Sequence, residues 1–520
     1  MQKKTDILFL FCERTIKYIS MIPVTLLFVL TLLYQNTISF DVVETSTIIP
    51  NGLSFFVAVV LAAVLLYAVY KLLKFVPEKL LFVVLALIYL AVGIYFITHI
   101  QMSARHDAGI CYSSALSFLE GDFTNIQFGK YLYKYPHQLG LVTYNCLLIL
   151  ISDNEKLVFF ANLLWVILTN FFFWRISCLL YKEKPLLRKM IVLLVFCFLP
   201  QFFFFFFSYG QVPGMVCLVG AVFFGFKYLE QNNKWDFGFC CLLLALSCLL
   251  RKNYLIGGIA LIIVFFLKIL QEKKWLHFLL VAVLAASMIL PGKAVSMFYE
   301  KVGDTELDKG LPAALHIAMG LQENEDPWRA NGWYNGYNEQ TYELYNCDPE
   351  TSADAGMEMI KERLGIFISR PDYGLEFFGE KIITTWCEPT YQSVWSGPLI
   401  IFGNETDSPF LENLYSGGSL FRLMSSVMNV LLVLIFMFSL VFVIGKTFVK
   451  KTVFGKMELF SLLFFVGGFL FHLAWETKSQ YVYPHVLVLI PVACRGMEYG
   501  FRFADGLWKR FRNRTKQAAA

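Results

Sequence analysis

One acid in the sequence stands where the general base of a membrane enzyme would be expected. Asp107 follows the apolar run at 79–99 and opens a polar stretch that extends to Pro136. A carboxylate so close to the bilayer surface is partly desolvated, which raises its pKa and suits it to proton abstraction. The competing interpretation is a simple helix-end charge in the interfacial region.

A basic residue, Arg251, lies between two apolar runs. Charged side chains at membrane depth are costly, and they usually serve a function. A phosphate-bearing lipid would suit this guanidinium, because guanidinium and phosphate groups form strong charge-assisted hydrogen bonds. Contact with lipid headgroups in general is the alternative.

Two further polar segments interrupt the apolar runs and could line a substrate site. The first is 208–214, whose Gly and Pro residues equally suit a plain tight turn. The second is 475–485, which combines the acid Glu476 with the base Lys478 and several hydrogen-bonding groups. That pair could instead clamp the loop structurally, and its spacing alone is a weak signal.

The elements that must position these residues are membrane helices. The chain is 57% hydrophobic, contains 53 Phe and is only 16% charged, whereas soluble domains carry about 25% charged residues. A helix needs about 20 apolar residues to cross the hydrocarbon. We expect twelve spans, near 16–37, 52–70, 79–99, 156–180, 190–207, 211–229, 236–250, 253–270, 275–291, 419–445, 457–475 and 481–498.

The distribution of charge predicts how the spans are oriented. Residues 292–418 hold 21 acidic and 8 basic residues, and the tail after Cys494 holds seven basic and two acidic. Lys and Arg collect on the cytoplasmic side. The cations of the loops fall on the cytoplasmic side in a single topology if the short apolar piece 139–151 does not cross the membrane. Among them are Lys273, Lys274, Lys450 and Lys451. The sequence thus predicts a multi-pass protein of the plasma (cytoplasmic) membrane with both termini cytoplasmic.

Four parts follow from this topology. They are a membrane module at 1–291 with a first outer loop at 100–138, an extracytoplasmic domain at 292–418, membrane helices at 419–498, and a basic cytoplasmic tail at 499–520. We expect the outer domain to be mixed, with a helix at 354–368. The aromatic and polar stretch 328–345 suits stacking on sugar rings or an interfacial aromatic belt. Cys347 and Cys387 share this domain, and their spacing does not decide whether they are bonded.

Several function classes lack their usual motifs. The sequence has no nucleotide-binding phosphate loop, no dinucleotide fingerprint and no His/Glu or Cys pattern typical of a zinc site. Its charge is segregated rather than uniformly basic, which argues against nucleic acid as a partner. A nucleotide-driven pump is therefore disfavoured.

Taken together, these segments resemble the GT-C superfamily of integral membrane glycosyltransferases, and most closely bacterial protein mannosyltransferases and lipid A aminoarabinose transferases. The likeness covers the topology of the whole chain, but its motifs are short. They are Asp107 in a large first outer loop with Tyr135-Pro136-His137-Gln138 in place of a Tyr-Pro-Pro-like element, the outer turn 208–214, and Glu476 to Pro484, which resembles Glu-x-x-x-Arg-Tyr-x-x-Pro.

The resemblance implies an all-α fold of about twelve membrane helices. It also implies an inverting transfer of sugar, at the outer face of the membrane, from a polyprenyl-phosphate donor to a glycan, lipid or protein acceptor. Asp107 would be the catalytic acid or base. Donor phosphate would be held by Arg251, Lys478 and Arg105. The substrate would be lined by Tyr135, His137, Gln138, Tyr209, Gln211, Glu476, Gln480 and Tyr481.

Two departures weaken the resemblance, because Gln480 replaces the motif's Arg and His137 its second Pro. Divalent-metal use varies in this family, and the sequence does not decide it. The alternatives are a lipid-linked glycan polymerase, ligase or flippase, a secondary transporter, or a non-enzymatic membrane assembly protein. A transporter should show inverted repeats and interrupted helices, and the sequence shows no such symmetry.

Overall fold

The computed structural model describes residues 2–272, 278–307, 309–326, 328–449 and 452–518. Four of the loop cations used to predict orientation, and the first residues of the span predicted at 275–291, lie outside these ranges. Within them the regular secondary structure is helical apart from one antiparallel hairpin. Its strands are β1 (Tyr34–Ile38) and β2 (Ser46–Pro50), with Tyr34 opposite Pro50.

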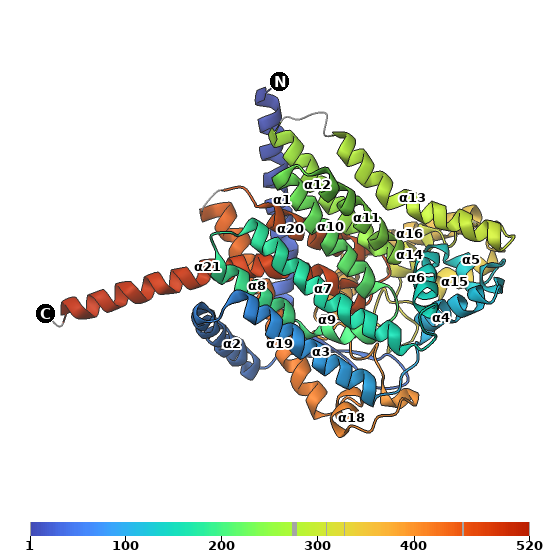
Figure 1. Ribbon diagram of the computed structural model, residues 1–520, viewed down its shortest axis with the longest axis horizontal. Helices are drawn as coiled ribbons and strands as arrows, with labels where there is room; N and C mark the ends of the chain where they lie inside the picture. The colour runs from blue at the N-terminus through green and yellow to red at the C-terminus, as the bar shows by residue number, and fades with distance from the viewer. Residues whose placement is uncertain (1, 273–277, 308, 327, 450–451, 519–520) are drawn as a thin grey trace.

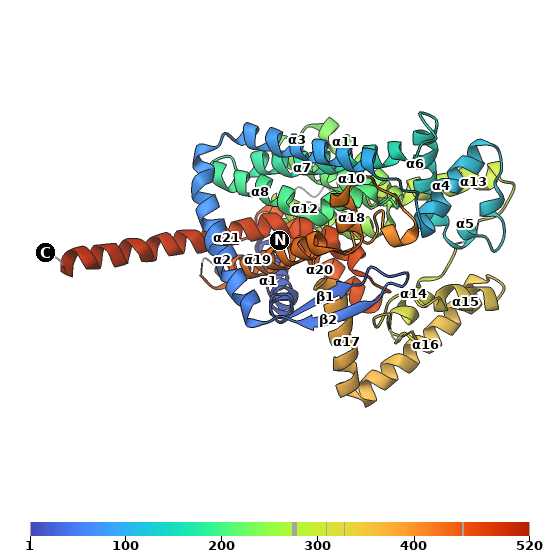
Figure 2. The same ribbon diagram turned by 90° about the horizontal axis from the view of Figure 1, so that it is seen from below.

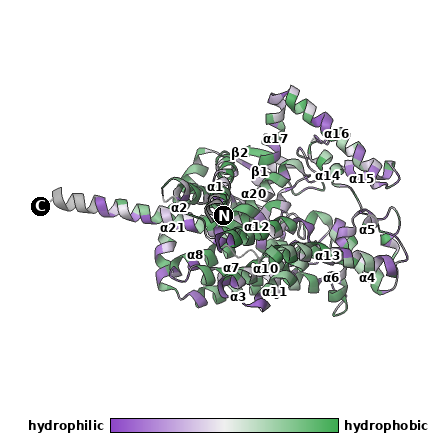
Figure 3. Ribbon diagram, turned by 90° about the horizontal axis from the view of Figure 1, so that it is seen from above, coloured by the Kyte–Doolittle hydropathy of each residue, from purple (hydrophilic) through white to green (hydrophobic). Residues whose placement is uncertain are grey.

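Nine helices in the described residues are long and apolar enough to cross a membrane. Together they form the elongated bundle of Figure 1, and apolar residues dominate its colouring in Figure 3. These helices are α1 (Gln2–Leu33), α2 (Leu53–Leu72), α3 (Glu78–His99), α7 (Lys156–Leu180), α10 (Gln211–Gln231), α12 (Leu255–Glu272), α13 (Phe278–Val302), α19 (Ser419–Ile444) and α20 (Lys456–Ala474).

A tenth crossing is made if a bent pair counts as one span. Helices α8 (Pro185–Cys197) and α9 (Leu199–Phe203) meet at an angle of 52° when α9 is taken on to Phe206. Pro200 lies in the first turn of α9, and proline lacks the N–H that would bond the carbonyl four residues earlier, in α8, and its ring clashes with that carbonyl. The break therefore falls where the sequence cannot continue an unbroken helix.

The prediction of twelve spans is thus too high, since nine or ten are supported. Helix α11 (Lys234–Leu250) has only 17 residues, fewer than the roughly 20 needed to cross. The segment 481–498 belongs to α21 (Ser479–Ala518), where Pro484, Pro491 and Arg495 dilute the apolar run. The piece at 139–151 forms α6 (Leu139–Ile149), which has 11 residues and is too short to cross, as predicted. The membrane and the orientation of the termini stay predictions.

The expectation of a mixed domain at 292–418 is wrong, because the described residues there form helices and loops and the hairpin lies elsewhere in the chain. Asp348 caps a long helix by accepting a hydrogen bond from the backbone N–H of Thr351, at 2.8 Å, and that helix contains the predicted 354–368. Figure 2 shows the first four of these helices together beside the bundle, and the fifth apart from them against the bundle helices. They are α14 (Ala313–Gly320), α15 (Tyr337–Leu344), α16 (Pro349–Ser369), α17 (Pro371–Trp386) and α18 (Pro409–Tyr415).

The two cysteines of this region are not bonded to each other. Cys347 and Cys387 are both free and buried. Cys347 packs in a small apolar cluster with Tyr133, Leu315 and Tyr342, whereas Cys387 follows the last residue of α17. The pairing that their spacing left open is therefore not formed.

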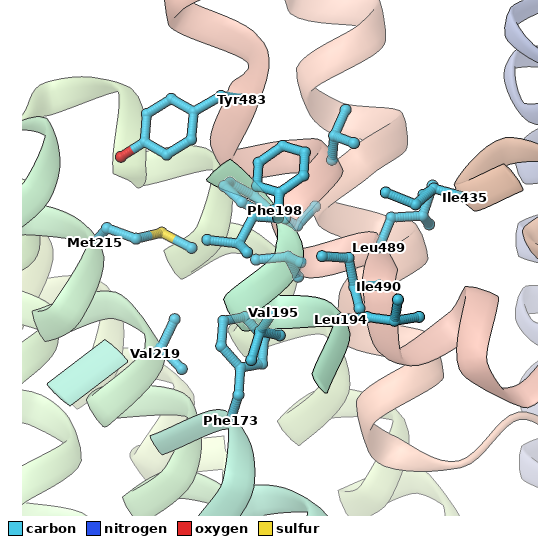
Figure 4. Close-up of a cluster of buried hydrophobic side chains, with 14 of the residues drawn as sticks. Phe173, Leu194, Val195, Phe198, Met215, Val219, Ile435, Tyr483, Leu489 and Ile490 are labelled. Atoms are coloured by element: carbon cyan, nitrogen blue, oxygen red, sulfur yellow. The ribbon is translucent and has the colours of Figure 1, made fainter. Parts of the chain in front are cut away.

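The core of the bundle lies where α7, α8, α10, α19 and α21 meet (Figure 4). The phenylalanine run at 202–206 is buried there among protein side chains, and Phe204 packs on Tyr483 with ring centroids 4.4 Å apart. An aromatic run of this kind suits lipid as well as a protein core. Packing inside the bundle fixes the end of α9, and with it the loop that leads into α10.

Candidate functional site

Asp107 lies at the start of α4 (His106–Leu119), the first helix of the loop predicted to be outside. The preceding residue, His106, has a positive φ of 51°, a conformation that ordinary side chains adopt at a cost. Asp107 is solvent-accessible but sits in a recess of dense protein. Burial in that recess raises the pKa of Asp107, and a hydrogen bond from Tyr209 opposes the rise. The recess therefore favours the protonated form of this carboxyl more than bulk water does, as a general base requires.

Tyr209 connects the acid to the other predicted segments. Its hydroxyl Oη donates to Asp107 Oδ2 at 3.1 Å and accepts from Gln138 Nε2 at 2.6 Å. The hydroxyl of Tyr131 lies 3.3 Å away. One phenol thus joins Asp107, Gln138 and the turn at 208–214, three features that the sequence singled out separately.

A glycine makes this arrangement possible. Gly210 follows Tyr209 with φ of +80°, and a Cβ built on it would lie 2.3 Å from the carbonyl oxygen of Leu250. Only glycine tolerates both the left-handed backbone and the close approach. The turn before α10 therefore packs directly against the end of α11, where Arg251 begins the next segment.

Arg251 stacks between two tyrosines. Its guanidinium carbon lies 4.6 Å from the ring centroid of Tyr209 and 5.6 Å from that of Tyr481. Both distances suit cation–π attraction. In the part of the chain that the structure describes, Arg251 has no hydrogen bond to an acid and no ion pair. The structure therefore gathers the acid, the cation and the turn before the last helix at one site, and leaves the guanidinium's N–H donors available.

Gln211 and Gln480 complete the contact between α10 and α21. Gln211 Nε2 donates to the backbone oxygen of Gln480 at 3.1 Å, and Gln480 Oε1 accepts from Ser396 Oγ at 3.2 Å. A cavity of about 10 Å³ lies beside them, which holds roughly one water. It is lined by Gln211, Arg251, Asn253, Tyr254, Phe464, Tyr481, Pro484 and His485.

The other two cations predicted to bind phosphate already have partners. Lys478 forms an ion pair with Glu44, in the loop between β1 and β2, and Glu44 also accepts from Gln392 Nε2 at 2.7 Å. Arg105 Nη2 donates to the backbone oxygens of Trp395 and Gly397, at 2.6 and 3.1 Å. An incoming phosphate would have to compete for both side chains.

Lys252, which follows Arg251 in the same polar break and was not predicted to bind phosphate, is the second uncommitted cation of the site. It is exposed, and within the described residues it has neither an ion pair nor a hydrogen bond from its ammonium group. Burial first, and then the charge of Lys252, lowers the pKa of His316 to about 4. His316 stacks on Trp475 with ring centroids 5.0 Å apart, and its Nδ1 is buried without a hydrogen bond. The neighbouring His137 is exposed, with its ring 6.0 Å from that of Tyr135.

Glu476 is a second acid beside Asp107. It is buried, and its Oε1 has no hydrogen-bond partner. Burial raises the pKa of Glu476 to about 7, although the charges of Lys478, Lys381 and Arg251 act in the opposite direction. A buried carboxyl oxygen without a hydrogen bond costs free energy. This oxygen is therefore a candidate for contact with substrate.

Lys381, in α17, ties the outer helices to the turn that carries Glu476. Its ammonium donates to the backbone oxygens of Leu473 and Trp475, both at 3.0 Å, and to that of Gly320. These carbonyls lie at the C-terminal ends of α20 and α14, where carbonyl groups have no hydrogen-bond partners within their own helix. The lysine is 1% exposed, so buried hydrogen bonds join α14, α17 and the end of α20.

A carboxylate from the outer helices also faces the site. Glu339 Oε1 accepts from the hydroxyl of Tyr135 at 2.8 Å and from that of Tyr334 at 3.1 Å. Lys134 pairs with the same carboxylate at 3.0 Å. The charge of Glu339 contributes to the raised pKa of Asp107. The predicted residue Tyr135 thus links the first outer loop to α15.

A buried acid that sequence reasoning missed supports the segment 388–397. Glu388 accepts hydrogen bonds from the backbone N–H of Thr390 at 2.9 Å and from Ser479 Oγ at 3.0 Å. Tyr391 and Gln392 follow with φ of 50° and 54°. Two successive non-glycine residues in this conformation are strained. The carboxylate therefore holds a strained loop against the first residue of α21.

An apolar groove adjoins the polar site. Its volume is about 520 Å³, and it lies between α1, α14, α16, α17 and α20. Ile317 in its wall follows His316, and Ala474 precedes Trp475, so the groove begins where the polar site ends. The wall consists of Leu26, Ile317, Leu321, Ile360, Leu364, Phe378, Ile382, Phe469, Leu473 and Ala474.

The described residues include no group of three or more His, Cys, Asp or Glu side chains placed to hold a metal ion. Comparison with models of known families, with curated proteins and with solved structures found no significant match. What the sequence and the structure together show is a polytopic, all-helical membrane protein with nine or ten candidate spans.

Proposed function

We propose that this protein is a glycosyltransferase that moves a sugar from a polyprenyl-phosphate donor to an acceptor at one face of the membrane. The observation that carries the proposal is the contact between Asp107, Tyr209, Arg251 and Tyr481. It places an acid that can take a proton beside a cation that has no acidic partner in the described chain. Inverting transfer from a sugar phosphate requires both.

The groove supports a lipid-linked donor rather than a soluble one. Its walls include residues of α1 and α20, both candidate membrane spans, so a chain in the bilayer can enter it without crossing water. All ten residues of its wall are apolar, which suits a prenyl chain. A prenyl tail in this groove would place its phosphate near His316 and Glu476, at the edge of the polar site.

The chemistry follows from these positions. Asp107 takes the proton of the acceptor hydroxyl as that oxygen attacks the anomeric carbon. The bond from the anomeric carbon to the phosphate oxygen breaks, and its electron pair stays on the lipid phosphate. Arg251 and Lys252 stabilise the charge that develops there. Attack on the face opposite the phosphate inverts the configuration of the sugar.

The alternative functions considered from the sequence can be distinguished by their activity in detergent and by their dependence on Asp107. A polymerase or ligase moving a lipid-linked glycan needs the same kind of site and is a variant of this proposal. A flippase needs two leaflets, so it has no measurable activity in detergent micelles, whereas a transferase keeps its turnover there. A scaffold is indifferent to the loss of the carboxylate.

The test is the composition and linkage of surface glycans in cells with and without the gene. Cells lacking it are complemented with the unchanged protein, with Asp107→Asn or with Glu120→Gln, which alters an exposed acid of the same loop. We expect Asp107→Asn to insert normally but to leave the glycan as in the deletion, and Glu120→Gln to restore it. Full restoration by Asp107→Asn would sink the proposal.

Donor binding can be measured separately with purified protein. The probe is a short-chain polyprenyl phosphate without sugar, so the sugar need not be known. We expect Arg251→Gln to weaken binding about tenfold, which corresponds to about 1.4 kcal/mol. Lys234→Gln, an exposed lysine outside the site, is the matched control. Equal binding by all three proteins would contradict the role of Arg251.

A further inference from the structure

The last part of α21 leaves the bundle as an amphipathic basic segment. We call residues 499–510 the tail helix; Figures 1 and 2 show it extending away from the other helices. The side chains of Phe503 and Leu507 are 70% and 49% exposed. They are four residues apart and so lie on the same helix face. Trp508 beside them is 67% exposed.

The charge of the tail helix is positive and mostly uncompensated. Its one acid, Asp505, forms an ion pair with Lys71 at 2.7 Å. Arg502 pairs with Glu498 at 2.6 Å. Lys509 and Arg510 are exposed and have no ion pair in the described part of the chain. The sequence then continues with three more cations, Arg512, Arg514 and Lys516.

The tail helix starts at the edge of the membrane region. Phe501 packs on Tyr67 and Tyr70 of α2, with ring centroids 5.2 and 5.1 Å apart. Helix α2 is the most peripheral span together with α13, since only 6% of its apolar window is buried in protein. The tail helix therefore leaves the bundle beside a lipid-facing helix. About 20 residues of α21, or roughly 30 Å, separate it from the candidate site.

We propose that the tail helix binds anionic lipid headgroups on the membrane face opposite the candidate site. Phe503 and Leu507 enter the interfacial region, while Lys509 and Arg510 contact the headgroups. Basic amphipathic helices bind membrane surfaces through these two contributions, which act together. Charge complementarity selects a lipid surface with negative charge over a neutral one, and the proposal does not depend on the reaction at the opposite face.

The test uses the full-length protein in nanodiscs of phosphatidylcholine with or without phosphatidylglycerol. Chymotrypsin cleaves after Phe503, Leu507 and Trp508, so its access reports whether their side chains are in lipid. We expect cleavage to be about tenfold slower in the anionic discs and to speed up in high salt, because salt screens exposed charges. Equal cleavage rates in the two kinds of disc would overturn the proposal.

Two variants separate lipid contact from other causes of protection. Lys509→Gln with Arg510→Gln keeps every chymotrypsin site and should weaken the protection by anionic lipid severalfold, at about 1 kcal/mol for each cation near the surface. Lys182→Gln with Lys234→Gln removes two exposed charges elsewhere and should leave it unchanged. Protection that is as large in this variant as in the unchanged protein would mean that Lys509 and Arg510 do not contact the headgroups, and it would overturn the proposal.

Discussion

Removal of the Tyr209 hydroxyl should change the pH dependence of turnover in a predictable direction. This hydroxyl donates to Asp107 at 3.1 Å and opposes the rise of the Asp107 pKa that burial causes. In Tyr209→Phe the carboxylate loses this bond, so its pKa rises further. Asp107 acts as a base only when deprotonated. The acidic limb of the rate profile therefore begins at a higher pH in the variant than in the unchanged protein.

The magnitude follows from the strength and exposure of that bond. Hydrogen bonds to charged groups contribute about 1.5–3 kcal/mol. Asp107 is solvent-accessible, and water screening reduces the contribution to about 1 kcal/mol. That corresponds to a rise of about 0.7 in the pKa of Asp107. We therefore expect the acidic limb to move up by about 0.7 pH unit, with little change in turnover on its alkaline side.

The assay is sugar transfer by purified protein in detergent over a range of pH. Tyr131→Phe is the matched control, since Tyr131 contacts Tyr209 at 3.3 Å but forms no hydrogen bond with Asp107. It should leave the limb in place. An unmoved limb in Tyr209→Phe, with turnover intact, would refute the assignment of Asp107 as the titrating base.

Three further predictions concern stability and are checked by thermal unfolding of purified protein. Gly210→Ala should destabilise by about 2 kcal/mol or more, because its Cβ would meet Leu250 in a left-handed backbone. Lys381→Met should lower the free energy of unfolding by about 3 kcal/mol, because it leaves buried carbonyl oxygens without hydrogen bonds. Glu476→Gln should have the same free energy of unfolding as the unchanged protein near pH 4.5 and a higher one, by up to about 3 kcal/mol, above pH 7. Burial raises the pKa of Glu476 to about 7, so the charged form of this side chain destabilises the folded protein. The first prediction would be contradicted if Gly210→Ala stabilised the protein, and the second if Lys381→Met left its stability unchanged. The third would be contradicted if the difference between Glu476→Gln and the unchanged protein did not vary with pH.

Hydropathy predicted most of the membrane helices because crossing a bilayer is a property of one continuous segment. Hydropathy predicted spans wrongly where a segment is barely long enough or barely apolar enough to cross the bilayer. Helix α11 is short, and the start of α21 mixes prolines and a basic residue with apolar ones. The outer region was misjudged because its aromatic and polar residues suit several local structures, and contacts with the bundle end select helices.

The site could be predicted where polarity is conspicuous. Asp107 and Arg251 stand out beside apolar runs, and the structure does bring them together. Lys252 lies in the same polar break as Arg251, but the sequence alone provided no reason to assign a role to both cations. Glu44 and Glu388 could not have been found, since their partners Lys478 and Ser479 are far away in sequence and only the fold makes them neighbours. Lys381 carries no signal at all, because its targets are backbone carbonyls.

The three hydrogen bonds of the Lys381 ammonium have a mechanical consequence. These bonds occupy all three N–H groups, so α14, α17 and the end of α20 cannot slide past one another without leaving buried carbonyl oxygens unpaired. The opposite side of the site is held by solvent-accessible hydroxyl contacts, such as that of Tyr209 with Asp107. We therefore expect any motion that widens the one-water cavity to occur on the side of α4, while α14, α17 and the end of α20 keep their positions.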